Sequence, residues 1–316
     1  MRKLGKVLIA IMMIAVAIGG LTYFYFRKGG IISGTITLGS IDLYVCPEKV
    51  SETETPLEVA ISINNSYPIS IRIRGGDLKF LVDSLELASA LIPNQTITQG
   101  PNILVANIIL NNTLIDEFWY QHLSRVETSN ISLEGSITFE TPLGDVRVPV
   151  KYSATIKTNI FPIEQDLNRE YDLVILGKVI ARNIKVELNS VSPYETYLKI
   201  SLTVENDLKI VPLYVRGLVF RIRTQGMTIL GTGEQESVKV IAPGETDTIV
   251  FTTVIDNTKI PMLWYEHIKS KEKTTIYIEA WLRVEVAGTT IELFKESPLR
   301  VSTEFKTNIF KYKENA

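Results

Sequence analysis

The feature that most constrains the fold of this chain is a long internal repeat. The segment Trp-Tyr-Gln-His at residues 119–122 returns as Trp-Tyr-Glu-His at residues 264–267, a shift of 145 positions. The pentapeptide Lys-Thr-Asn-Ile-Phe at residues 157–161 returns unchanged at residues 306–310. Solenoid repeats have units of roughly 20–50 residues, so a shift this long indicates two copies of a whole domain.

Most of each copy has the pattern of β-strands. Residues 57–63 alternate apolar and polar side chains, and residues 69–74 alternate isoleucine with serine and arginine. The second copy has corresponding segments at residues 197–205 and 213–217. Alternation with period two and many β-branched residues is typical of half-buried strands. Short strands of this spacing predict a β-sandwich in each copy.

One segment of each copy has the periodicity of a helix. The apolar or aromatic positions between residues 115 and 123 are spaced i, i+3, i+4, i+7 and i+8, and residues 260–268 repeat that spacing. This spacing places the side chains on one face of an α-helix. Residues 112–113 and 257–258 (Asn-Thr in both copies) are candidates for the N-caps. We therefore expect a mainly β fold with one short α-helix in each domain.

A membrane anchor is predicted ahead of the first copy. Residues 7–26 form a run of 20 residues without a charge, which is about the length of a helix that spans a bilayer. The run is longer than the apolar region of a secretory signal, roughly 7–15 residues, and it ends in aromatic residues typical of a membrane interface. Three basic side chains precede it and two follow it, which favours a cytoplasmic N-terminus and extracytoplasmic domains.

These patterns predict four segments. A cytoplasmic tip and transmembrane helix occupy residues 1–30, and the first sandwich occupies residues 31–161. Residues 162–172 are polar, charged and begin with proline, so we expect a linker there. The second sandwich occupies residues 173–316. The expected location is the cell membrane, in a protein that crosses it once.

Charge and cysteine content exclude some classes of function. The chain has a net charge of −2, and its first 28 residues carry five basic and no acidic side chains, so the remainder sums to −7. An acidic ectodomain is a poor partner for nucleic acid, which attracts clustered Lys and Arg. Cys46 is the only cysteine, so the chain cannot form an internal disulfide.

Trp119, His122, Trp264 and His267 are the residues that most invite a catalytic or metal-binding interpretation, because they recur at the same repeat position. However, a zinc site needs three or four nitrogen, sulfur or carboxylate ligands, and one histidine per domain cannot supply them. We interpret these four residues as a structural signature that fills the interior. We predict no catalytic residue, no cofactor-binding residue and no metal ligand.

Common catalytic motifs are missing from the sequence. It contains neither a glycine-rich phosphate loop nor a Gly-x-Ser-x-Gly elbow, and no His-Glu-x-x-His pair. With two histidines and one distant cysteine, nucleophilic triads have almost no general base to use. The sequence therefore predicts a protein that is not an enzyme and binds no cofactor.

Four motifs follow one another in a fixed order. An apolar strand enters an Asn-rich turn at residues 59–68, and an Arg-Gly strand follows at residues 73–75. A Pro-Gly turn precedes an alternating strand at residues 243–251, and a short helix comes next. This order resembles the water stress and hypersensitive response (WHy) domain of the group 2 late-embryogenesis-abundant (LEA type 2) proteins. The first copy departs from this pattern, with Gln-Gly-Pro at residues 99–101 in place of the Pro-Gly turn.

The resemblance covers residues 36–161 and 173–310 and implies immunoglobulin- or fibronectin-III-like sandwiches, each with a helix. It implies no catalytic residues, and a role in tolerance of desiccation or related stress. The expected function is thus a non-catalytic, membrane-anchored protein that protects cell-envelope components under stress. The alternative is a binding or assembly module for a protein, glycan or lipid partner at the cell surface. Besides the membrane itself, a protein or lipid partner is expected, and nucleic acid is not.

Overall fold

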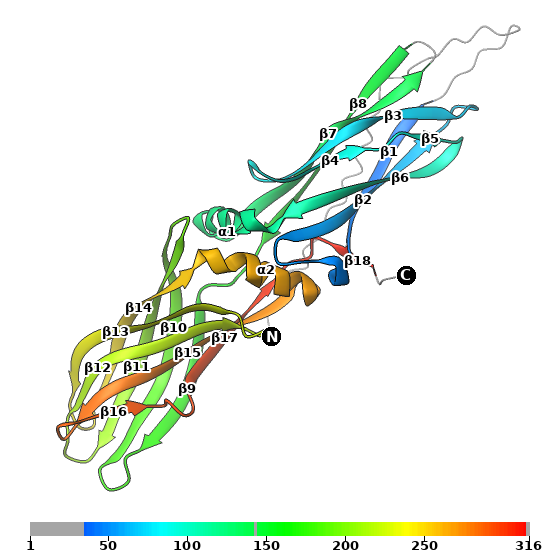
Figure 1. Ribbon diagram of the computed structural model, residues 1–316. Coiled ribbons are helices and arrows are strands. Elements are labelled where there is room, and N and C mark those ends of the chain that lie inside the picture. The colour runs from blue at the N-terminus through cyan, green and yellow to red at the C-terminus, as the bar shows by residue number, and fades with distance from the viewer. Residues whose placement is uncertain (1–34, 142–143, 314–316) are drawn as a thin grey trace, which may run out of the picture. The chain divides into compact units, whose positions relative to one another are not determined.

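The computed structural model describes residues 35–141 and 144–313, and these are mainly β, with sandwich-like sheets and few helices (Figure 1). The chain divides into two compact units. Unit 1 contains the described residues up to Phe118, Thr128–Lys157 and the residues from Thr307 onward. Unit 2 contains Trp119–Glu127 and Thr158–Lys306.

Unit 1 is built from two sheets. The first has the strand order β18-β1-β2-β6. Its strands are β18 (Lys311–Tyr312), β1 (Ile36–Val45), β2 (Glu54–Asn65) and β6 (Gly100–Asn111). The second sheet has the order β4-β3-β7-β8, and β5 also pairs with β3. Its strands are β4 (Leu85–Ile92), β3 (Ile71–Val82), β7 (Thr128–Thr141), β8 (Gly144–Lys157) and β5 (Gln95–Ile97). A 3-10 turn, η1 (Pro47–Lys49), connects β1 with β2.

Unit 2 is also built from two sheets. One sheet has the order β14-β11-β10-β9. Its strands are β14 (Thr246–Asp256), β11 (Glu195–Leu208), β10 (Gly177–Val191) and β9 (Ile163–Asp172). The other has the order β13-β12-β15-β16, and β17 also pairs with β15. Its strands are β13 (Ile229–Ile241), β12 (Leu213–Thr224), β15 (Lys273–Val286), β16 (Thr289–Leu293) and β17 (Leu299–Lys306).

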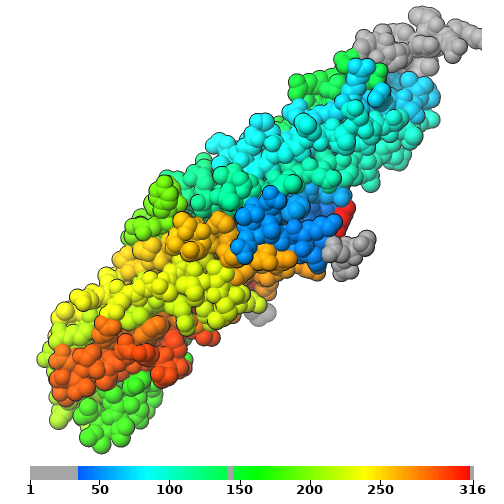
Figure 2. Space-filling view, in the orientation of Figure 1, coloured from blue at the N-terminus to red at the C-terminus, as the bar shows by residue number. Residues whose placement is uncertain are grey.

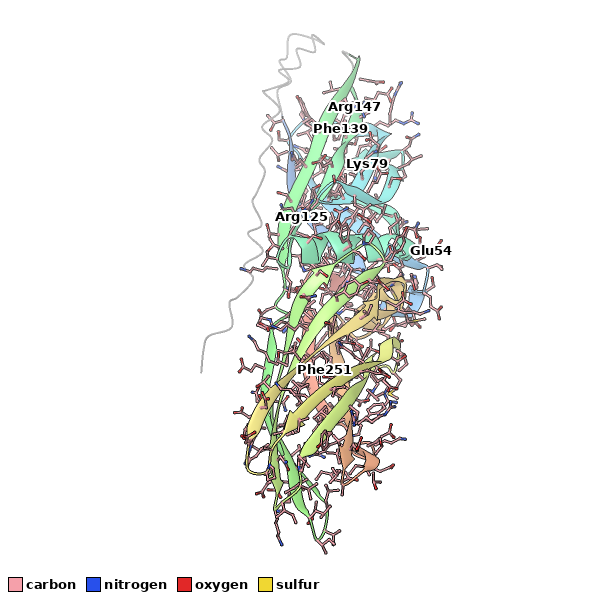
Figure 3. The ribbon with its side chains drawn as sticks, turned by 90° about the vertical axis from the view of Figure 1, so that its left-hand side faces the viewer. Glu54, Lys79, Arg125, Phe139, Arg147 and Phe251 are labelled. Carbon is pink, nitrogen blue, oxygen red and sulfur yellow. The ribbon has the colours of Figure 1, made fainter. Side chains whose placement is uncertain are left out.

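The period-two pattern of the sequence becomes the inner and outer faces of these sheets. In β2 and β11 every second residue is buried, and the residues between them are exposed or half-buried. Phe139 in unit 1 and Phe251 in unit 2 are 0% and 1% exposed and lie in the interior of their units (Figure 3). Burial of such a side chain contributes about 1.5–3 kcal/mol. The predicted strand faces are confirmed.

Each copy has one short helix, as predicted, preceded by a 3-10 turn. The turns η2 (Asn112–Leu114) and η3 (Asn257–Lys259) lead into α1 (Ile115–Ser124) and α2 (Ile260–Lys269). The predicted N-caps are one residue too late, because Asn111 and Asp256 accept hydrogen bonds from the amides of Thr113 and Thr258, each at 3.0 Å.

Asn112 and Asn257 instead turn inward and join strands of their own unit. Thr55 donates to Asn112 and Thr196 donates to Asn257, each at 2.8 Å. All four side chains are fully buried. The asparagine that follows each strand is thus part of the core, and the residue before it caps the helical turn.

The prediction of a linker at residues 162–172 is wrong. Residues 163–172 form strand β9, which pairs antiparallel with β10 from Ile163 to Asp172. β9 is the edge strand of its sheet, and most of its side chains are exposed. An edge strand with solvent on its outer side can be polar and charged, so its composition resembles that of a linker.

The predicted domain boundaries also differ from the two units. Trp119–Glu127 belongs to unit 2, although the first copy encodes it, and the residues from Thr307 onward belong to unit 1. β18 pairs in parallel with β1 near Tyr44, and Lys311 forms an ion pair with Asp42 at 2.7 Å. The sequence repeat therefore does not coincide with the structural units.

No helix within residues 35–141 and 144–313 is both long enough and apolar enough to cross a bilayer. The predicted span at residues 7–26 lies outside the described part of the chain.

Candidate functional site

All four signature residues are buried. Trp119, His122, Trp264 and His267 are 2%, 1%, 3% and 0% exposed. Trp119 and His122 lie on α1, and Trp264 and His267 lie on α2 at the same repeat positions. The structure assigns all four to unit 2, whereas the repeat predicted one pair in each domain.

Trp119 and His267 meet at one phenylalanine. The ring centroids of His267 and Phe305 are 4.3 Å apart, and those of Trp119 and Phe305 are 6.1 Å apart in an edge-to-face arrangement. Nε1 of Trp119 donates a hydrogen bond to the hydroxyl of Thr196 at 3.0 Å. Offset and edge-to-face aromatic pairs contribute about 0.5–1.5 kcal/mol beyond the area they bury. The signature residue of the first copy thus packs among residues that the second copy encodes.

Burial keeps His267 neutral. Its Nδ1 lies 3.3 Å from the hydroxyl of Thr274, and desolvation by burial lowers its pKa from 6.5 to about 3. An imidazole with this pKa is a weak base at neutral pH and poorly suited to general acid–base catalysis, which works best when the pKa is near the operating pH.

His122 is part of a buried chain of polar groups. The hydroxyl of Thr158 donates to Oε2 of Glu127 at 2.7 Å and lies 2.9 Å from Nε2 of His122. Because the hydroxyl proton goes to the carboxylate, Nε2 of His122 is assigned as the donor to the threonine oxygen. Glu127 also accepts from the amides of Ile160 and Phe161, at 2.6 and 2.8 Å.

The hydrogen bonds to Glu127 give the repeated pentapeptide at residues 157–161 a structural role. β8 ends at Lys157, and residues 158–161 are irregular. Their amides bond to the side chain of Glu127 in place of a strand partner. The sequence contained a signal for the role of Glu127, because Glu127 and Glu272 are related by the same shift of 145. Both residues are buried and both have a positive φ, 55° and 61°.

The hydrogen-bonded series His122, Thr158 and Glu127 has the residue types of a proton relay, but its burial favours a structural role. The three residues are 1%, 9% and 6% exposed, so a substrate would have to displace packed side chains to reach them. The carboxylate is already occupied by three donors. No group of three or more His, Cys, Asp or Glu side chains that could hold a metal occurs among the described residues.

A cluster of charges lies on β12, β15 and β17 of unit 2. Glu279 forms ion pairs with Arg221, Arg223 and Arg300 at 2.7, 2.9 and 2.7 Å. The guanidinium groups of Arg223 and Arg300 lie 4.8 and 5.5 Å from the centre of the Tyr277 ring. Burial by itself raises the pKa of Glu279, but hydrogen bonds from the three arginines outweigh it and hold the pKa at about 2. Glu279 is therefore ionised throughout the physiological range.

The first copy has a weaker version of this cluster. Glu134 stands at the repeat position of Glu279, opposite Lys79 on one neighbouring strand and Lys151 on the other. Its ion pair with Lys151 is 3.8 Å long, and its side chain is 49% exposed. The side chain of Glu279 is 1% exposed. The repeat relates Glu134 to Glu279, but the arginines that bury Glu279 are specific to the second copy.

An open hollow of about 450 Å³ lies beside Glu134 on the outer face of unit 1. Arg147 forms an ion pair with Asp77 at 2.7 Å, and Ser136 donates to the same carboxylate at 2.7 Å. The hydrogen bond from Ser136, followed by those from Arg147, lowers the pKa of Asp77. Lys79 and Arg147 are labelled in Figure 3. Gly135 also lines the hollow. A larger residue does not fit at this position, because its Cβ would lie 2.0 Å from the carbonyl oxygen of Asp77.

No family model matches the sequence, and no curated protein matches it. Among solved structures, a protein from Archaeoglobus fulgidus is 22% identical, with 40% of this chain and 97% of that chain covered and a TM-score of 0.36. A protein from Arabidopsis thaliana is 18% identical, with coverages of 43% and 89% and a TM-score of 0.29. Red sea bream transglutaminase is 9% identical, with coverages of 87% and 31% and a TM-score of 0.22. At these TM-scores the likenesses carry no argument about family or activity.

Proposed function

We propose that this chain is a non-catalytic, membrane-anchored protein of the tandem WHy (LEA type 2) class that protects envelope components during desiccation or related stress. The observation that carries the proposal is the burial of both repeated Trp-His pairs. His267 packs on Phe305, and His122 is hydrogen-bonded through Thr158 to Glu127. The residues that the two copies share most closely are therefore used for packing. A protein of this kind acts through its surface.

The family assignment rests on the sequence resemblance, and two observations support it. Each unit consists of two sheets, as expected for immunoglobulin- or fibronectin-III-like sandwiches. Each copy also carries its short helix at the position that the resemblance implies. Anchoring rests on the uncharged run at residues 7–26 and on the basic residues around it.

Protection can be measured on a client enzyme that loses activity on drying or heating. The full chain in detergent should preserve more client activity than an inert protein added at equal mass in the same detergent. A client that retains no more activity than with the inert protein rules out the protective role. Cell fractionation tests the anchor, since a chain that lacks residues 1–30 should move from the membrane to the soluble fraction.

Substitution of both histidines separates this proposal from an enzymatic one. A variant with His122→Ala and His267→Ala should lose stability, because two buried side chains are removed. An activity of the wild-type chain that disappears in this variant, under conditions where the variant stays folded, would favour an enzyme.

The second candidate function is a binding or assembly module. The observation that favours it is the outer side of β6, where Ile103, Val105 and Ile109 are 67%, 37% and 54% exposed. Exposed apolar side chains of this kind are suited to contact with another protein or with lipid. Co-purification of a stoichiometric partner from membranes, together with no protection of dried clients, would favour this second function.

A further inference from the structure

One surface of unit 2 carries more positive charge than its own carboxylates balance. Arg221 on β12 and Arg300 on β17 lie opposite Glu279 on β15, one on each neighbouring strand. Arg223 follows two residues after Arg221, and these four side chains form the Glu279 cluster. Figure 2 shows part of the outer face of this sheet, in yellow-green to orange-red. Three protonated guanidinium groups and one ionised carboxylate leave two positive charges in excess.

Other carboxylates on the same sheet do not balance this excess. Glu234 on β13 and Glu304 on β17 are exposed, and each forms an ion pair with a basic residue outside the cluster. Within residues 35–141 and 144–313, the three arginines form ion pairs with Glu279 and with no second carboxylate. The two excess charges therefore lack a counter-charge in the described part of the protein.

Two of the guanidinium groups keep unused donors at the surface. Arg221 contacts Glu279 through Nε and Nη2 at 2.9 and 2.7 Å, and Arg300 does so at 3.0 and 2.7 Å. A guanidinium has five N–H groups, so both protons of Nη1 and one of Nη2 remain on each arginine. The two side chains are 42% and 52% exposed, so a ligand can reach these protons from solvent. The Nη1–Nη2 edge binds oxyanions through two parallel hydrogen bonds.

Contacts inside the cluster hold its arginines in place. The guanidinium groups of Arg223 and Arg300 lie 4.8 and 5.5 Å from the centre of the Tyr277 ring, which is a cation–π arrangement. Arg223 is 9% exposed, and its Nε is buried without an acceptor among the described residues. The cluster thus has more donors than acceptors. Because its side chains are already ordered, binding a ligand here sacrifices little conformational entropy.

We propose that the Glu279 cluster binds a tetrahedral dianion, a sulfate or phosphate group, at the free Nη1–Nη2 edges of Arg221 and Arg300. The charge count selects a dianion, because it neutralises the two excess charges, whereas a monocarboxylate leaves one of them. A purely structural ion pair needs one arginine, and further guanidinium groups beside it repel one another. The inference does not depend on the proposed protective function.

The test is a calorimetric titration of inorganic sulfate into the purified full chain, in an uncharged detergent and a chloride buffer of constant ionic strength. The wild type should bind sulfate with a Kd below about 1 mM. Acetate, a monoanion, should bind at least about tenfold more weakly. Arg221→Gln and Arg300→Gln should each raise the Kd for sulfate at least about tenfold, because each removes charge-assisted hydrogen bonds.

Arg216→Gln is the matched control. Arg216 lies on the same strand as Arg221 and has a similarly exposed side chain, 38% against 42%. Its charge is already balanced by Glu285 at 2.6 Å, so this variant should bind sulfate as the wild type does. If a glutamine variant of the cluster loses its β-sheet circular dichroism, the lysine variant at that position replaces it. Lysine keeps the charge but lacks the planar fork, so it should also weaken binding.

Two further titrations separate a free ion from a group carried by a larger molecule. Inorganic phosphate and glucose 6-phosphate present the same group to the cluster. A Kd for glucose 6-phosphate that equals or exceeds that of inorganic phosphate assigns the site to the free anion. A Kd at least about tenfold lower assigns it to a phosphorylated molecule. Both results support the site.

A wild-type Kd for sulfate above about 1 mM, or no binding at all, overturns the proposal. Binding that is unchanged in the cluster variants overturns it as well. So does an equal loss of binding in Arg216→Gln, since sulfate would then respond to surface charge in general. Acetate that binds as tightly as sulfate contradicts the assignment of a dianion.

Discussion

Nε1 of Trp119 donates a hydrogen bond to the hydroxyl of Thr196 at 3.0 Å, although the two residues are 77 positions apart and belong to different copies of the repeat. Thr196 in turn donates to Asn257 at 2.8 Å, which joins the indole to the residue at the start of η3. A tryptophan from one copy is thereby built into the unit formed mostly by the other.

We expect Trp119→Phe to lower the free energy of unfolding of unit 2 by about 1–3 kcal/mol, because it removes a buried hydrogen bond and keeps most of the ring. Trp119→Ala should cost about 3–5 kcal/mol, since it also empties the space beside Phe305. Unfolding in urea, followed by circular dichroism, measures both. Tyr120→Phe on the same helix is the control, and an equal loss in that variant would contradict the role assigned to Trp119.

We expect the conformation of the irregular segment at residues 158–161 to require the carboxylate of Glu127. Glu127→Gln replaces one carboxylate oxygen with an amide nitrogen, which faces a donor from Thr158, Ile160 or Phe161. The expected cost is about 1.5–3 kcal/mol, the range for hydrogen bonds to a charged group. Hydrogen exchange should show faster exchange of the amides of Ile160 and Phe161. The control is Glu52→Gln at an exposed position, and unchanged exchange in Glu127→Gln would contradict the assignment.

Local features of the fold could be predicted from the sequence. The spacing of apolar residues gave both helices, since a helical face is defined within about ten residues. Arg74 and Arg216 each form an ion pair with a carboxylate of their own unit. Their partners are Glu140 at 2.9 Å and Glu285 at 2.6 Å, which the repeat shift relates.

Features that depend on distant parts of the chain could not be predicted. Periodicity assigns the faces of a segment but does not say which sheet receives it. The exchange of Trp119–Glu127 into unit 2 therefore left no local signal. β9 was missed because an edge strand with solvent on its outer face has the composition of a linker. Glu127 and Thr158 are 31 positions apart, and neither residue type indicates a partner by itself.

The low pKa of His267 makes the stability of unit 2 depend on pH. The pKa is about 3 in the folded state against 6.5 for an ordinary histidine, so the unfolded state binds more protons between these values. The free energy of unfolding is therefore unaffected by His267 above about pH 6.5, and protonation of this residue in the unfolded state lowers it as the pH falls towards 3. Each unit of pKa difference is worth about 1.4 kcal/mol, so the loss amounts to a few kcal/mol.

The histidine contribution can be isolated with His267→Gln, which cannot take up a proton in this range. Although less stable at neutral pH, this variant should have a flatter pH dependence between about pH 4 and 6.5. Urea unfolding at a series of pH values measures the slope. A slope equal to that of the wild type would show that His267 does not titrate as its burial requires.

Glu279 should contribute to stability in a lower range of pH, and its repeat equivalent provides the comparison. Its pKa is about 2 in the folded state against 4.5 in the unfolded state, so the stability it adds is complete above about pH 4.5 and is lost as the pH falls through 2. Glu279→Gln removes the carboxylate that pairs with Arg221, Arg223 and Arg300 and should cost about 3–5 kcal/mol at neutral pH, the range for breaking a buried ion pair. Glu134→Gln, at a side chain that is 49% exposed, should cost no more than about 1 kcal/mol. An equal loss of free energy of unfolding in Glu279→Gln and Glu134→Gln would contradict the stabilising role assigned to the ion pairs of Glu279.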